Sequence, residues 1–221
     1  MILVEEGKPL YLIGLDLGQS ADYTAVAILE QIGTQPAHFH LRHLRRFPLK
    51  TSYQAIADDV ASLTRREELA KQQWVVIADA TGVGAPVIDM LKRLELKPVA
   101  ITITAGFEVT RLTGREFRVP KRDLVSTLRL LLDDRRLKIA QGLPDAQTLV
   151  SELLNFRLKI SKGGTDTYEP WREGEHDDLV LATALAAWYG EHQVKAEARE
   201  DQERPKRKKR LLGDPEYYFG R

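Results

Sequence analysis

The chain has 221 residues, of which 43% are hydrophobic and 29% are charged, and its formal net charge is +1. These proportions suit one globular domain that buries a core, and they exclude a fibre or a wholly disordered chain. Because the chain has no cysteine, disulfides and thiolate zinc sites are excluded, and any metal needs Asp, Glu, His or backbone ligands.

The apolar runs of the sequence are short. None approaches the roughly 20 residues that a helix needs to cross a bilayer. The first 14 residues also lack the basic start and small-residue cleavage pattern of a secretory signal. We therefore expect a cytoplasmic protein that has no membrane partner, in the cytoplasm of a host cell if a phage encodes it.

The first part of the chain predicts three antiparallel strands, at 10–17, 23–32 and 37–47. Each run is rich in apolar or β-branched residues or alternates in polarity, and short polar links join them. A helix at about 52–72 follows, with Thr51 and Ser52 as candidate N-caps.

The middle of the chain predicts strands that alternate with helices. The expected elements are strands at 74–79 and 97–103 and a helix at about 85–95. Three antiparallel strands followed by this alternation imply the α/β class, with a central mixed five-stranded sheet flanked by helices.

The second half predicts an added hairpin and a buried last helix. In chain order, the expected elements are a basic hairpin at 107–120 that turns at Thr113-Gly114, a helix from Pro120 to about 134, a helix from Pro144 to about 155, a second hairpin at 156–171 and a helix at 176–193. The last helix is apolar almost all round, which is typical of a buried helix. We expect one domain at 1–193 and a charged, basic, flexible tail at 194–221.

Asp16 and Asp79 each end an apolar strand and each precede a bend that contains glycine. If the two strands are parallel neighbours, their ends lie about 4.8 Å apart and the carboxylates sit side by side. Like charges at that range either raise one pKa or need a cation between them. A turn-forming role is the plainer interpretation of either aspartate alone.

Asp177 and Asp178 stand at the start of the last helix, after His176. The helix dipole alone accounts for one aspartate there. Two in a row, on a helix that is expected to pack on the sheet, favour a site that faces the strand ends. Asp22, in the loop after the first strand, is either an auxiliary ligand or a turn residue.

Carboxylates in such a cluster predict two Mg²⁺ or Mn²⁺ ions, since oxygen ligands suit these metals. Two such ions about 3.5–4 Å apart activate water for in-line attack on a phosphodiester and stabilise the leaving oxygen. No protein nucleophile is then needed.

Three stretches carry a resemblance to a known family. They are "IGLDLGQSADYTAVAILE" at 13–30, "VVIADATGVGAPVIDML" at 75–91 and "EHDDLVLATALAAW" at 175–188. Together they resemble the nuclease domain of the large terminase subunit of tailed bacteriophages. The resemblance implies an RNase H-like (RuvC-like) fold and metal-dependent cutting of concatemeric viral double-stranded DNA during genome packaging.

The resemblance also implies roles for individual residues. Its catalytic metal ligands fall on Asp16, Asp79 and Asp178, with Asp177 as helper and Asp22 as an auxiliary ligand. It places the hairpin near the DNA path, with Arg111, Arg115, Arg118 and Lys121 as DNA contacts. From the residues alone, the three arginines are an exposed strand face. Implied partners are an ATPase motor domain, the small terminase subunit and the portal.

The chain departs from a full terminase because it has no G-x-x-x-x-G-K-[ST] phosphate loop. We expect either an excised C-terminal half or a separately encoded nuclease, without motor activity of its own. The alternatives are a Holliday-junction resolvase-like nuclease, an actin-like or sugar-kinase-like ATPase, and a non-catalytic DNA-packaging adaptor.

Overall fold

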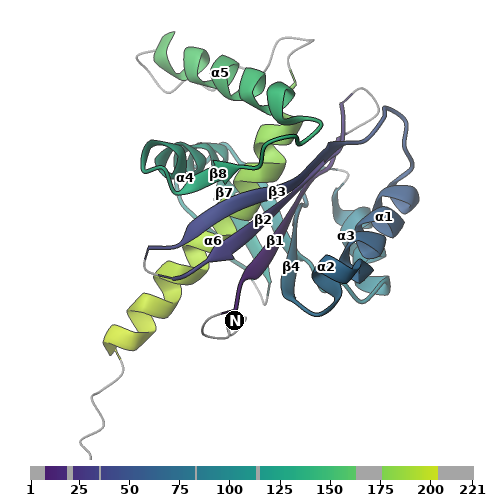
Figure 1. Cartoon of the computed structure of the whole chain (residues 1–221), viewed down its shortest axis with the longest axis horizontal. Coiled ribbons are helices and arrows are strands. Elements are labelled where there is room, and N and C mark those ends of the chain that lie inside the picture. The colour runs from purple at the N-terminus through teal and green to yellow at the C-terminus, as the bar shows by residue number, and fades with distance from the viewer. Residues whose placement is uncertain are drawn as a thin grey trace, which may run out of the picture.

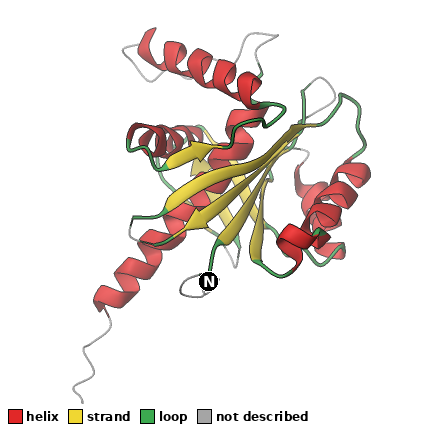
Figure 2. Cartoon of the chain, in the orientation of Figure 1, coloured by secondary structure: helices red, strands yellow, loops and turns green. Residues whose placement is uncertain are grey.

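The structure is a computed structural model, and it describes residues 8–18, 22–34, 36–82, 84–112, 115–162 and 176–203. Within these ranges, one eight-stranded sheet has the strand order β6-β7-β5-β4-β1-β2-β3-β8. The strands are β1 (Leu10–Asp16), β2 (Ala25–Ile32), β3 (His38–Arg46), β4 (Gln73–Asp79), β5 (Val99–Thr104), β6 (Thr110–Arg111), β7 (Glu116–Pro120) and β8 (Leu137–Ile139). Figure 2 shows the sheet in yellow between red helices.

The sheet is mixed, as the sequence predicts. Strands β1, β2 and β3 are antiparallel, and β4 lies parallel to β1 on its other side. Strand β5 then pairs parallel with β4.

The expected count of five strands is wrong, because both edges of the sheet extend further. The predicted hairpin exists as β6 and β7, and β7 pairs parallel with β5, so the hairpin belongs to the sheet. At the other edge, β8 pairs parallel with β3. Strand β8 has only three residues, too few for a periodic pattern, and the sequence did not predict it.

Helices cover both faces of the sheet. They are α1 (Tyr53–Arg65), α2 (Glu67–Ala70), α3 (Gly84–Arg93), α4 (Lys121–Asp133), α5 (Ala146–Lys162) and α6 (Asp178–Glu203). Side chains of α1, α2 and α3 build one hydrophobic core against the sheet, and side chains of α4, α5 and α6 build the other. Figure 1 shows these two groups of helices on opposite sides.

The helix expected at 52–72 is interrupted. Ser52 caps α1, because its hydroxyl accepts a hydrogen bond from the Ala55 amide at 3.2 Å. Thr51, the other candidate cap, instead donates its hydroxyl to the Pro48 carbonyl. At Arg66 the backbone is extended, with φ −63° and ψ 150°, and it separates α1 from α2.

Helix α5 runs to Lys162, so the second hairpin is wrong over 156–162. The rest of that predicted hairpin, from residue 163 on, lies outside the described residues. Residues 156–162 contain Leu, Arg, Lys and Ile, which are acceptable in a helix, and the glycines that suggested a turn come only afterwards.

Helix α6 is buried from Asp178 to Tyr189, as its apolar pattern predicts. It crosses β1 closely at Gly14, where a Cβ atom would lie 1.9 Å from the Ala182 carbonyl oxygen. Glycine is therefore required at this approach of two backbones.

Helix α6 also continues to Glu203, past the tail boundary expected at residue 193. Ala, Glu, Lys and Arg, which favour helix, dominate this extension. The division into a domain at 1–193 and a flexible tail stays a prediction, and residues 204–221 lie outside the described part. None of the described helices is both long enough and apolar enough to cross a membrane.

Candidate metal-dependent active site

Asp16 and Asp79 lie at the same edge of the sheet. Strands β1 and β4 are parallel, with Leu15 opposite Ala78, so the two aspartates follow at adjacent strand ends. Both are buried, with 6% and 8% of their surface exposed. The Asp79 carboxylate accepts a hydrogen bond from the Thr81 amide at 2.8 Å, which fixes its orientation at the start of the bend.

The start of α6 brings two more carboxylates to these strand ends. Burial raises the pKa of Asp16 well above its ordinary value, and the charges of Asp79, Asp177 and Asp178 raise it further. Burial also raises the pKa of Asp79, while its hydrogen bonds with Thr81 oppose the shift. We call these four aspartates, Asp16, Asp79, Asp177 and Asp178, the carboxylate cluster.

Two cations partly neutralise the carboxylate cluster. The Lys121 ammonium, at the start of α4, lies 2.8 Å from Asp177 and lowers the pKa of both Asp16 and Asp79. The Arg46 guanidinium, at the end of β3, lies 3.1 Å from Asp178 Oδ2. Burial raises the pKa of Asp178 to about 6, and Arg46 opposes that rise.

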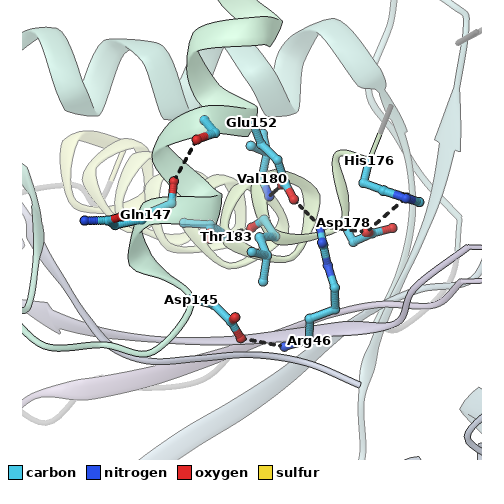
Figure 3. A network of polar contacts seen from close by, with 10 residues as sticks. Arg46, Asp145, Gln147, Glu152, His176, Asp178, Val180 and Thr183 are labelled. Carbon is cyan, nitrogen blue, oxygen red and sulfur yellow. Dashed lines mark hydrogen bonds and ion pairs between the residues drawn. The ribbon is translucent and has the colours of Figure 1, made fainter. Parts of the chain in front are cut away.

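The sequence prediction missed Arg46 and Glu152, which adjoin the carboxylate cluster (Figure 3). The Arg46 guanidinium also forms an ion pair with Glu152 of α5, whose side chain is 6% exposed. Burial raises the pKa of Glu152 to about 7, although the Val180 amide and Arg46 both lower it. A signal exists in the sequence, since Glu152 stands three residues after the buried Leu149 and so falls on the apolar face of α5.

The other predicted site residues are Asp22 and the hairpin arginines. Asp22 is exposed beside a hollow that Pro48 and Tyr53 also line. In the hairpin, Arg118 is exposed, and the Arg111 guanidinium lies 5.6 Å from the centre of the Phe117 ring. Arg115 donates a hydrogen bond to the Lys97 carbonyl.

Lys121 is placed differently from the hairpin arginines, with which the sequence grouped it. It lies on α4, in the helix that the sequence predicts from Pro120, and its ammonium contacts Asp177 of the carboxylate cluster.

The chemistry of the cluster suits a hard divalent cation. Its donors are carboxylate oxygens, and the charges of Asp79, Asp177 and Asp178 raise the pKa of the buried Asp16, so a cation there relieves repulsion. Across the described ranges, however, no three Asp, Glu or His side chains stand close enough to form a metal site as they are. Lys121 and Arg46 hold Asp177 and Asp178 instead.

Comparisons with solved structures agree with the fold. The chain is 20% identical to the large terminase nuclease from thermophilic phage G20c, with a TM-score of 0.51, and the match covers 80% of this chain and 81% of that one. The zinc-bound form of the phage G20c nuclease matches at 22% identity and a TM-score of 0.50, over 80% of each chain.

A terminase nuclease domain from another virus gives a similar result. The human cytomegalovirus terminase nuclease domain, soaked with Mn, is 12% identical with a TM-score of 0.56, and the match covers 88% of this chain and 90% of that one. At such identities these likenesses show the fold alone. No curated protein sequence matched significantly.

The family model of the terminase RNaseH-like domain matches residues 13–189. This range begins within β1 and ends within α6, so it spans every aspartate of the carboxylate cluster. The resemblance noted in the sequence is thereby confirmed, and the chain belongs to the terminase RNaseH-like domain family.

Proposed function

We propose that this protein is a metal-dependent endonuclease of the phage terminase type, which hydrolyses phosphodiester bonds of double-stranded DNA. The observation that carries the proposal is the convergence of aspartates from β1, β4 and α6 in a chain of the terminase RNaseH-like family. A buried group of like charges is costly to maintain unless a cation is bound there during the protein's work.

In this proposal, Asp16, Asp79 and Asp178 hold two Mg²⁺ or Mn²⁺ ions, and Asp177 assists. The ions supply Lewis-acid chemistry, which activates a water molecule and stabilises the leaving oxygen of the DNA strand. Carboxylate oxygens are suitable ligands for both metals, while a chain without cysteine has no thiolate to attract softer ones.

The residues of the chain have separate tasks in this scheme. Asp79 keeps a fixed orientation because the Thr81 amide donates to it. The Lys121 ammonium offsets the negative charge of the cluster beside Asp177, and it lies at the site edge with a 21% exposed side chain. A cation at such an edge also attracts the phosphates of an approaching DNA strand.

We propose DNA packaging as the setting, with concatemeric viral DNA as substrate. An ATPase motor domain, the small terminase subunit and the portal are the partners that this role would involve, in the cytoplasm of an infected cell. Low sequence specificity is expected, since phosphate contacts carry no sequence information.

The test is nicking of a supercoiled plasmid by the wild type and by Asp16→Asn, with Mn²⁺, Mg²⁺ or a chelator. We expect cutting by the wild type with metal only, and a large loss of cutting in Asp16→Asn. Asp58→Asn is the matched control, because it makes the same chemical change on an exposed face of α1.

Two results would overturn the proposal. Undiminished cutting by Asp16→Asn would remove the cluster from the reaction. Binding of DNA without any binding of Mn²⁺ at millimolar concentration would favour a non-catalytic packaging adaptor.

A further inference from the structure

Two consecutive arginines at the end of β3 serve opposite faces of the sheet, as alternation along a strand requires. Arg45 faces α1, where its guanidinium lies 2.9 and 3.0 Å from the two oxygens of Asp59, and its side chain is 42% exposed. Arg46 faces α5 and α6, and its side chain is only 18% exposed. Arg45 therefore forms an ordinary surface ion pair, while the ion pairs of the neighbouring Arg46 are largely shielded from solvent.

Arg46 is held from several elements at once (Figure 3). Its Nη2 atom contacts both the Glu152 carboxylate and Asp178 Oδ2, the latter at 3.1 Å. Its guanidinium lies 4.7 Å from the centre of the Tyr23 ring, and its backbone amide donates to Asp145 at 3.1 Å. Such an arrangement leaves the guanidinium little freedom to move.

Glu152 fixes the beginning of α6. Its Oε2 atom accepts a hydrogen bond from the Val180 amide at 3.1 Å. That amide lies in the first turn of α6, where backbone donors have no partner within the helix. Glu152 thus caps α6 from another helix, while its other oxygen holds Arg46.

The Asp178 carboxylate is buried, but one of its oxygens lacks a hydrogen bond. Among the described residues, its Oδ2 atom has no hydrogen-bond partner, because the nearby Arg46 is not aligned to donate. Buried acceptors are almost always hydrogen-bonded, so an open one needs an explanation. An oxygen that is held by charge and keeps its lone pairs open is suited to accept a metal ion.

We propose that Arg46 and Glu152 form a positioning pair, which holds the Asp178 carboxylate in place for the divalent ions. Glu152 sets the first turn of α6, and Arg46 sets the direction of the side chain. The helix cap and the contact with Arg46 together order the Asp178 carboxylate. This inference rests on the proposed function, since it requires Asp178 to be a metal ligand.

The test is titration of Mn²⁺ by calorimetry in the absence of DNA. We expect Arg46→Met to weaken Mn²⁺ binding about tenfold or more, the usual cost of removing a group that orients a metal ligand. Arg46→Lys should restore binding to within about threefold of the wild type, because one nitrogen contacts both carboxylates and an ammonium can replace it.

A second variant distinguishes an effect on the orientation of Asp178 from a loss of folding. Glu152→Gln keeps an oxygen for the Val180 amide but loses the ion pair with Arg46, and we expect about threefold weaker Mn²⁺ binding. Thermal unfolding without metal reports whether each variant folds. If Arg46→Met does not fold, the result for Glu152→Gln decides.

Arg45→Met is the matched control, since it removes the neighbouring arginine and its ion pair with Asp59 on the other face. It should bind Mn²⁺ as the wild type does. In plasmid nicking at limiting Mn²⁺, Arg46→Met should lower kcat and leave KM for DNA unchanged. Saturating Mn²⁺ should restore much of the lost kcat.

The possible failures are distinguishable. Wild-type or tighter Mn²⁺ binding by folded Arg46→Met, or unchanged binding by Glu152→Gln, would overturn the positioning pair, provided that Asp178→Asn still loses metal. If Asp178→Asn binds Mn²⁺ and cuts as the wild type does, the assignment of Asp178 fails, and the positioning pair fails with it.

Discussion

The carboxylate cluster and the β6–β7 hairpin hold charge in opposite ways. In the cluster, Asp16, Asp79 and Asp178 are buried, and compensation comes from Lys121 and Arg46 on other elements. In the hairpin, Arg118 is exposed, and Phe107, just before β6, is 72% exposed beneath the Arg122 guanidinium at 4.4 Å.

The two regions differ in how much folding free energy their charges cost. A buried carboxylate destabilises the fold unless it is paired, so its presence points strongly to a task. An exposed arginine costs little, and its presence alone says little. The evidence for a reaction therefore rests on the cluster, while the hairpin supports only a weaker inference of DNA contact.

Asp16→Asn should have the largest effect, on the cluster side of the comparison. We expect cutting to fall about 1000-fold, because a lost ligand removes several kcal/mol of metal-based stabilisation. Initial rates of plasmid nicking with Mn²⁺ measure it. DNA binding without metal should stay at the wild-type level, and a loss there would mean that Asp16 serves DNA binding.

Gly14→Val tests whether the cluster depends on the close docking of α6 on β1. The new side chain meets the Ala182 carbonyl, so we expect about 3 kcal/mol less free energy of unfolding in urea. Gly106→Ala is the control, because the nearest atom to its added Cβ is the Thr104 hydroxyl oxygen at 3.5 Å. Equal stability of the two variants would contradict the packing.

A pH dependence distinguishes the buried charges from exposed ones. The pKa of Glu152 is raised from 4.5 to about 7 in the folded protein. Between these values the unfolded chain loses the proton while the folded one keeps it, so stability falls as pH rises.

We therefore expect the metal-free wild type to lose about 2 kcal/mol relative to Glu152→Gln between pH 4.5 and 7. Urea unfolding of both proteins with a chelator at several pH values measures the difference. A stability difference that does not change with pH, or that shifts with rising pH in favour of the wild type, would show that the pKa of Glu152 is not raised in the folded protein.

Arg118→Ala should have the smallest effect, on the hairpin side. We expect DNA affinity to fall a few-fold and the salt dependence of binding to lose a slope of about 1, with Mn²⁺ binding unchanged. Binding isotherms at several salt concentrations measure both. Arg129→Ala, on the exposed face of α4, is the comparison, and an equal loss there would mean that the hairpin has no special role.

The sequence by itself determined the parts of this protein that local patterns encode. Apolar strands that end in Asp16 and Asp79 were evident, as were the buried last helix with its two leading aspartates and the basic hairpin. Each of these signals lies within a few consecutive residues, where the period of apolar residues and the turn residues are sufficient.

Only the tertiary structure decided which distant groups meet. Arg46 and Glu152 are 106 residues apart and Lys121 and Asp177 are 56 apart, and no local pattern relates either pair. The sequence likewise did not predict that β8 pairs with β3 or that α5 extends to Lys162. The reason is physical: the contacts that hold Asp178 form only once the sheet and helices have packed.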